Sequence, residues 1–98
     1  MTKFNELKEK YLERLEMYVP VVERVHGGEH PEFFEVRKLF DQIKVKLEDA
    51  GSQLAELETE FAGLQKITNN YSIPQGVCET YEAVYEMLAE LNQAYKEL

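Results

Sequence analysis

The chain has 98 residues, of which 44% are hydrophobic and 31% are charged, so its length and composition fit one globular domain. Its formal net charge is −8, from 19 acidic and 11 basic residues. Binding to nucleic acid or to an anionic membrane needs a positive surface, so the charge balance argues against both functions. No apolar run approaches the ~20 residues of a membrane span, and the polar first residues do not resemble a signal peptide. We therefore expect a cytoplasmic protein.

The first predicted helix covers residues 3–26. Its apolar residues recur at steps of three and four, as in a helix that buries one face: Phe4, Leu7, Tyr11, Leu15, Tyr18, Val22 and Val25. Gly27 and Gly28 follow this segment. Glycine often ends a helix because it adopts the left-handed conformation without strain, so we expect such a cap here.

The second predicted helix covers residues 31–68 and opens at Pro31, a residue that suits the first helical turn. Its apolar seam alternates steps of four and three: Val36, Phe40, Ile43, Leu47, Ala50, Leu54, Leu57, Phe61, Leu64 and Thr68. An unbroken helix of this length would be ~57 Å long. A break at Gly51 would instead divide the segment and give a monomeric four-helix bundle. The uninterrupted spacing favours the continuous helix.

The third predicted helix covers residues 73–98. Ser72 and Gln75 have the spacing of a capping box, and the apolar steps that follow are again four and three. No segment alternates with a period of two, so we predict no sheet. The connections are short, which makes neighbouring helices antiparallel. The expected fold is thus a single all-α domain over residues 1–98, an antiparallel up-down-up three-helix bundle with a long middle helix.

The predicted middle helix is longer than either neighbour can cover, so part of its apolar seam would face water in a monomer. Exposed apolar patches of that size usually mark a partner surface. We therefore predict that dimerisation completes the bundle and that the chain is a homodimer. The predicted interface residues are Phe40, Ile43, Leu47, Leu54, Leu57 and Phe61.

Three stretches of the sequence contain glycine, and two of them also contain histidine or cysteine. They read VVERVHGGEHPE at residues 21–32, DAG at residues 49–51 and TNNYSIPQGVCETYEAVYEML at residues 68–88. Together they resemble the iron–sulfur cluster repair branch of the hemerythrin-like di-iron proteins. The resemblance implies a four-helix bundle that holds two irons through histidine and carboxylate ligands. It also implies a role in repairing iron–sulfur clusters damaged by nitric oxide or peroxide.

The sequence departs from this family at most of the ligand positions. His26 matches a ligand in the family's Val-His-Gly segment, but no histidine precedes it. Leu47 stands where the family's Glu-His-x-(Glu/Asp)-Ala-Gly segment has its histidine. The family's final His-x-x-x-Glu would begin near Leu98, where this chain stops. We therefore expect no bound cofactor, with iron as the alternative.

Glu23, His26 and His30 are the candidate metal ligands. Glu23 and His26 have the Glu-x-x-His spacing of di-iron bundles, which places both side chains on one face. His26 and His30 have the four-residue spacing of helical zinc sites, although Gly27 and Gly28 should break the helix between them. The alternative interpretation of His26 is a residue that complements the dipole at a helix C-terminus.

Cys78 is the one cysteine of the sequence and lies in the first turn of the last predicted helix. A thiol at a helix N-terminus can be reactive. The alternative, which the sequence favours, is a small buried side chain, because no basic residue lies near Cys78 along the chain.

The function expected from these features is that of a non-enzymatic helical interaction protein related to the hemerythrin-like repair proteins, without a di-iron centre. The alternative is a stress-response iron-binding or iron–sulfur cluster repair protein whose metal site is completed across a dimer. A full-length iron–sulfur cluster repair protein is a further candidate partner.

Overall fold

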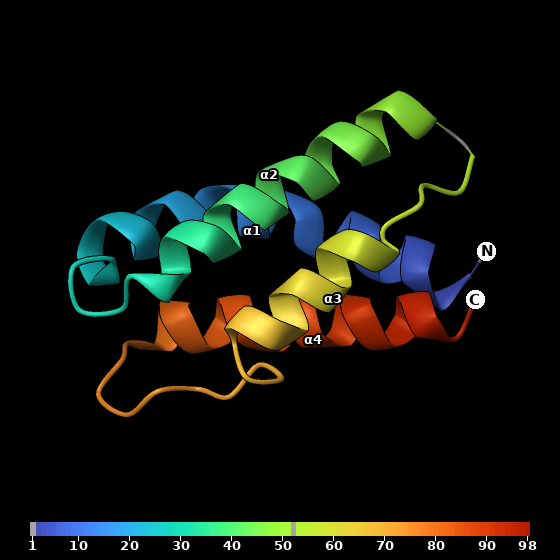
Figure 1. Ribbon diagram of the computed structural model, residues 1–98. Coiled ribbons are helices and arrows are strands. Elements are labelled where there is room, and N and C mark those ends of the chain that lie inside the picture. The colour runs from blue at the N-terminus through green and yellow to red at the C-terminus, as the bar shows by residue number, and fades with distance from the viewer. Residues whose placement is uncertain (1, 52) are drawn as a thin grey trace.

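The computed structural model describes residues 2–51 and 53–98, and within them the chain forms four α-helices and no strand. Successive helices run in opposite directions (Figure 1). The start of α1 therefore meets the end of α4, where the ring centroids of Phe4 and Tyr95 lie 5.5 Å apart. The all-α prediction is confirmed. The helices are α1 (Lys3–His26), α2 (Glu32–Ala50), α3 (Glu58–Ile67) and α4 (Glu79–Lys96).

One core joins all four helices, and α1 has the bounds that its apolar spacing predicts. Each fully buried Val, Leu or Phe contributes about 1.5–3 kcal/mol, so this core is the main source of stability. No helix in the described part of the chain is both long and apolar enough to cross a bilayer. The largest fully buried side chains come from every helix and from the residue just before α3: Leu15, Val19 and Val22 of α1; Phe33, Val36 and Phe40 of α2; Leu57 before α3 and Leu64 within it; and Tyr81, Val84, Tyr85 and Leu88 of α4.

The predicted continuous helix over residues 31–68 is wrong, because the chain turns at Gly51. Gly51 has φ +59° and ψ −118°, the values of the first central residue of a type II′ turn, and a side chain disfavours them. The N–H of Gln53 donates to the carbonyl of Ala50 at 2.9 Å, which closes the turn. A helix of ~57 Å would also exceed the molecule, whose longest dimension is 38 Å.

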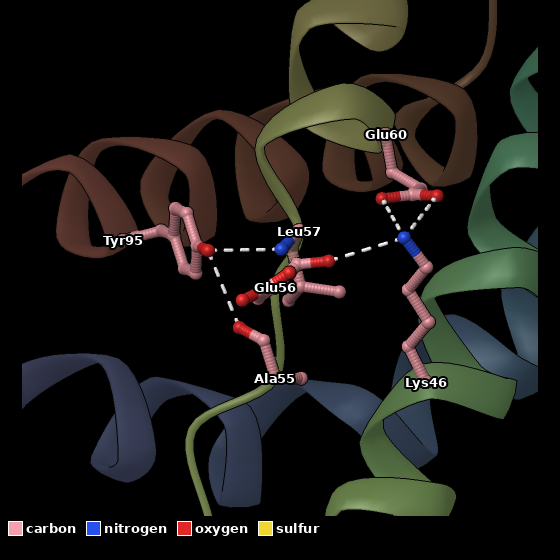
Figure 2. Close-up of polar contacts among 6 residues, drawn as sticks. All are labelled: Lys46, Ala55, Glu56, Leu57, Glu60 and Tyr95. Carbon is pink, nitrogen blue, oxygen red and sulfur yellow. Dashed lines mark hydrogen bonds and ion pairs between the residues drawn. The ribbon is translucent and has the colours of Figure 1, made fainter.

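The segment that returns from this turn to α3 is held by two side chains (Figure 2). The hydroxyl of Tyr95 accepts a hydrogen bond from the N–H of Leu57 at 2.8 Å and donates one to the carbonyl of Ala55 at 3.2 Å. The ammonium of Lys46 donates to the carbonyl of Glu56 at 3.1 Å and forms an ion pair with Glu60 at 2.9 Å. The three hydrogen bonds satisfy backbone groups that a helix would otherwise pair.

The break changes the position of the residues predicted at a dimer interface. Four of them are buried in the core of the single chain, namely Phe40, Ile43, Leu57 and Phe61. Leu47 packs against the same core, and only Leu54 is largely exposed, at 64%. The apolar seam of α2 is not left exposed in the single chain, because α3 folds back along α2 and covers it.

The predicted start of the last helix at residue 73 is also wrong, because α4 begins at Glu79. Ser72 does not cap a helix, and its hydroxyl donates to the carbonyl of Asn69 at 2.7 Å. Gly76 has φ +79°, which no helix accommodates. Cys78, not Ser72, is the N-cap residue of α4.

The turn after α3 contains three consecutive residues with positive φ, namely Asn69, Asn70 and Tyr71, at 53°, 59° and 61°. Asparagine tolerates this conformation, whereas tyrosine rarely adopts it. Thr68 compensates for the strain, because its hydroxyl accepts from the N–H of Tyr71 at 2.7 Å and donates to the carbonyl of Leu64 at 2.6 Å. This turn sets the path by which the chain reaches α4.

Replacing Gly51 with alanine distinguishes between the observed turn and a continuous helix over residues 31–68. Alanine in a continuous helix would stabilise the protein by about 1 kcal/mol relative to glycine. In the observed turn it is expected to destabilise the protein by about 1–2 kcal/mol, because a Cβ disfavours φ +59°. Urea unfolding of Gly51→Ala and of the parent chain measures the sign, and a more stable variant would contradict the turn.

Replacing Tyr95 with phenylalanine tests the anchor of the returning segment. The change leaves the N–H of buried Leu57 without its partner, so we expect a loss of about 1–3 kcal/mol in the free energy of unfolding. Tyr18→Phe is the matched control, because Tyr18 packs against the same core but makes neither of the two hydrogen bonds that Tyr95 makes. Equal melting temperatures for the two variants would refute the anchoring role.

Candidate functional site

The turn between α1 and α2 brings His26 and His30 to one end of the bundle. His26 is the last residue of α1, and the N–H of His30 donates to its carbonyl at 2.8 Å. The left-handed cap predicted at Gly27 is wrong, since Gly27 has φ −58°. Glycine is needed there for space, because a Cβ at Gly27 would clash with the backbone carbonyl of Glu23 and lie 2.8 Å from Cζ of Phe34. The close turn therefore depends on the absence of a side chain at residue 27.

The loop before α4 brings Cys78 to the same end. Its Sγ lies 3.2 Å from Nε2 of His26, although the two residues are 52 positions apart in the sequence. The thiol makes no capping bond to the backbone of α4 and is exposed to solvent. The interpretation of Cys78 as a small buried side chain is therefore wrong. The structure instead places a thiol beside an imidazole at the N-terminus of an 18-residue helix.

The ring of Tyr81 packs against the rings of both histidines. Its ring centroid lies 5.4 Å from that of His26 and 5.6 Å from that of His30, and both contacts are edge-to-face. Its hydroxyl lies 3.1 Å from the hydroxyl of Tyr85, and both tyrosines are buried. Burial raises the pKa of both hydroxyls above the usual value of 10, so they stay neutral at physiological pH.

Each of the three residues predicted as metal ligands contacts a different partner. Oε1 of Glu23 forms an ion pair with Nη1 of Arg37 at 2.9 Å, on the α2 side of α1. Nδ1 of His30 lies 3.2 Å from Oε1 of Glu32. The ring centroids of His30 and His26 are 6.5 Å apart. In residues 2–51 and 53–98, no three His, Cys, Asp or Glu side chains are arranged to hold a metal ion.

The Cys78–His26 pair is the chemically distinctive part of this end. The Sγ of Cys78 and the Nε2 of His26 lie within hydrogen-bonding distance, at 3.2 Å. The thiol is exposed to solvent and therefore accessible to alkylating reagents. Sequence patterns could not show the pair, because the two residues meet only through the tertiary fold.

No family model matches this chain, and no solved structure matches it. The resemblance to the hemerythrin-like repair proteins therefore rests on the sequence stretches alone.

Alkylation of Cys78 tests whether His26 activates the thiol. We expect His26→Ala to slow the reaction of Cys78 with iodoacetamide about three- to tenfold at neutral pH, because the nearby proton acceptor is lost. His30→Ala is the control, since His30 contacts Glu32. Mass spectrometry of quenched samples gives the rates. Identical rates for the parent chain and His26→Ala would show that the contact has no chemical consequence.

Proposed function

We propose that this chain is a non-enzymatic helical interaction protein, related to the hemerythrin-like iron–sulfur cluster repair proteins and working without a di-iron centre. It acts by contact with another protein chain. The candidate partners are a second copy of the chain and a full-length iron–sulfur cluster repair protein.

The observation that carries this proposal is that each predicted ligand has another partner. Glu23 pairs with Arg37, His30 with Glu32, and His26 with Cys78. A di-iron site in a helical bundle takes carboxylates and histidines from facing helices, all directed inward. Here the side chains directed inward at this end are aromatic, and the ring of Phe33 stacks on that of Tyr85 with centroids 6.2 Å apart. Aromatic packing thus fills the interior near the histidines.

Exposed apolar side chains support the interaction part of the proposal. Phe34 and Val45 on α2 are 52% and 56% exposed. Several exposed large apolar side chains on one small acidic protein are typical of a contact site.

The alternative function is iron binding with a site completed across a dimer. The grouping of two histidines and one exposed thiol at one end of the bundle favours it. It requires Glu23 to leave Arg37, which breaks a half-buried ion pair. We therefore place it second.

Iron loading decides between the two functions. The chain is incubated with ferrous iron without oxygen, desalted and analysed for metal. We expect less than about 0.1 iron per chain, because a site with so few convergent ligands cannot retain the metal through desalting. His26→Ala should give the same value.

A near-stoichiometric iron content would overturn the proposal in favour of the alternative. In that case His26→Ala should abolish binding, whereas Lys10→Ala, at an exposed position on α1, should retain it.

A further inference from the structure

A seam of four residues runs along α2 on the side opposite the core. Phe34, Lys38, Asp41 and Val45 follow each other at steps of four, three and four, the spacing by which helices pair in coiled coils. Their counterparts on the inner side are the buried Phe33, Val36, Phe40 and Ile43. The outer α2 seam, as we call these four residues, therefore has an apolar residue at each end and one charge of each sign between.

The surroundings of the outer α2 seam are balanced in charge. It borders an open groove of about 710 Å³ that also includes Glu23 of α1 and Glu60 of α3. Three basic side chains line this groove, and so do three acidic ones: Arg37, Lys38, Lys46, Glu23, Asp41 and Glu60. The chain as a whole carries −8, so two copies repel each other least where the local charge is zero.

We propose that the outer α2 seam binds the outer α2 seam of a second copy in antiparallel orientation. A two-fold axis between residues 39 and 40 places Phe34 opposite Val45 of the second copy. The same axis places Lys38 opposite Asp41 of the second copy. Each contact occurs twice, so the surface complements itself, as a symmetric dimer requires. This inference rests on the proposed interaction function and specifies its partner.

The contact is small, because α2 has 19 residues and is therefore ~28 Å long. A single helix pair buries less than the ~1,200 Å² of a stable interface, so the dimer is weak and reversible. We expect a dissociation constant of about 10–100 µM, weaker in high salt because two exposed ion pairs contribute.

Sedimentation equilibrium of the full chain at up to about 0.5 mM tests the dimer. The parent chain should associate reversibly, and Val45→Glu should weaken association at least about tenfold by placing a charge against Phe34. Met17→Glu is the matched control, an equally exposed apolar residue on α1, and should change the affinity less than about twofold. Circular dichroism melts confirm that each variant folds.

Charge reversal tests the antiparallel register. Lys38→Glu places two carboxylates together, and Asp41→Lys places two ammonium groups together, so each single change should lower affinity about three- to tenfold. The double variant Lys38→Glu with Asp41→Lys restores opposite charges and should recover affinity to within about threefold. Recovery requires that the two positions meet across the axis.

A monomeric parent chain at the highest concentration would overturn the inference. So would a dimer that is lost in Met17→Glu but not in Val45→Glu, and so would a double variant as weak as the single ones. Iron content and association are measured separately on the same preparations. An iron-free monomer would therefore refute this inference alone, and an iron-loaded dimer would refute the metal-free function alone.

Discussion

The hydroxyl of Tyr95 is the point on which the return of the chain depends. After Gly51 the backbone leaves the helix and must enter the core, because Ala55 and Leu57 are buried. Buried backbone groups without partners cost about 1–3 kcal/mol each, comparable to burying one large side chain. Tyr95 satisfies one donor and one acceptor of this segment with a single atom (Figure 2). The last turns of α4 thus determine where α3 begins.

Lys46 and Glu60 secure the same segment from the other side. Glu60 is only 4% exposed, and a buried carboxylate without a partner would be strongly destabilising. The ammonium of Lys46 reaches both oxygens of this carboxylate and the carbonyl of Glu56, while its own side chain stays 43% exposed. The ion pair therefore keeps α2 beside α3, and this packing is what covers the inner seam of α2 within one chain.

The apolar spacing predicted the core but not the break. Phe40, Ile43, Leu57 and Phe61 are buried, as residues of a seam should be. Two antiparallel helices that face one core produce the same steps of four and three as one long helix, because periodicity records which residues face inward and not the direction of the chain. Gly51 alone carried the signal of the turn, and its cost in a helix, about 1 kcal/mol, is too small to exclude a continuous helix.

Sequence spacing was equally unable to predict the contacts made at the end of the bundle that carries His26 and His30. Sequence spacing placed Glu23 and His26 on one helix, but the tertiary partners decided their contacts, since Arg37 of α2 takes Glu23 and Cys78 meets His26. The aromatic side chains of Phe33, Tyr81 and Tyr85 fill the interior at this end. Polar chemistry is thereby confined to the rim, where the thiol and the imidazole remain accessible to solvent. Any reactivity at this end therefore belongs to side chains at the surface of the bundle.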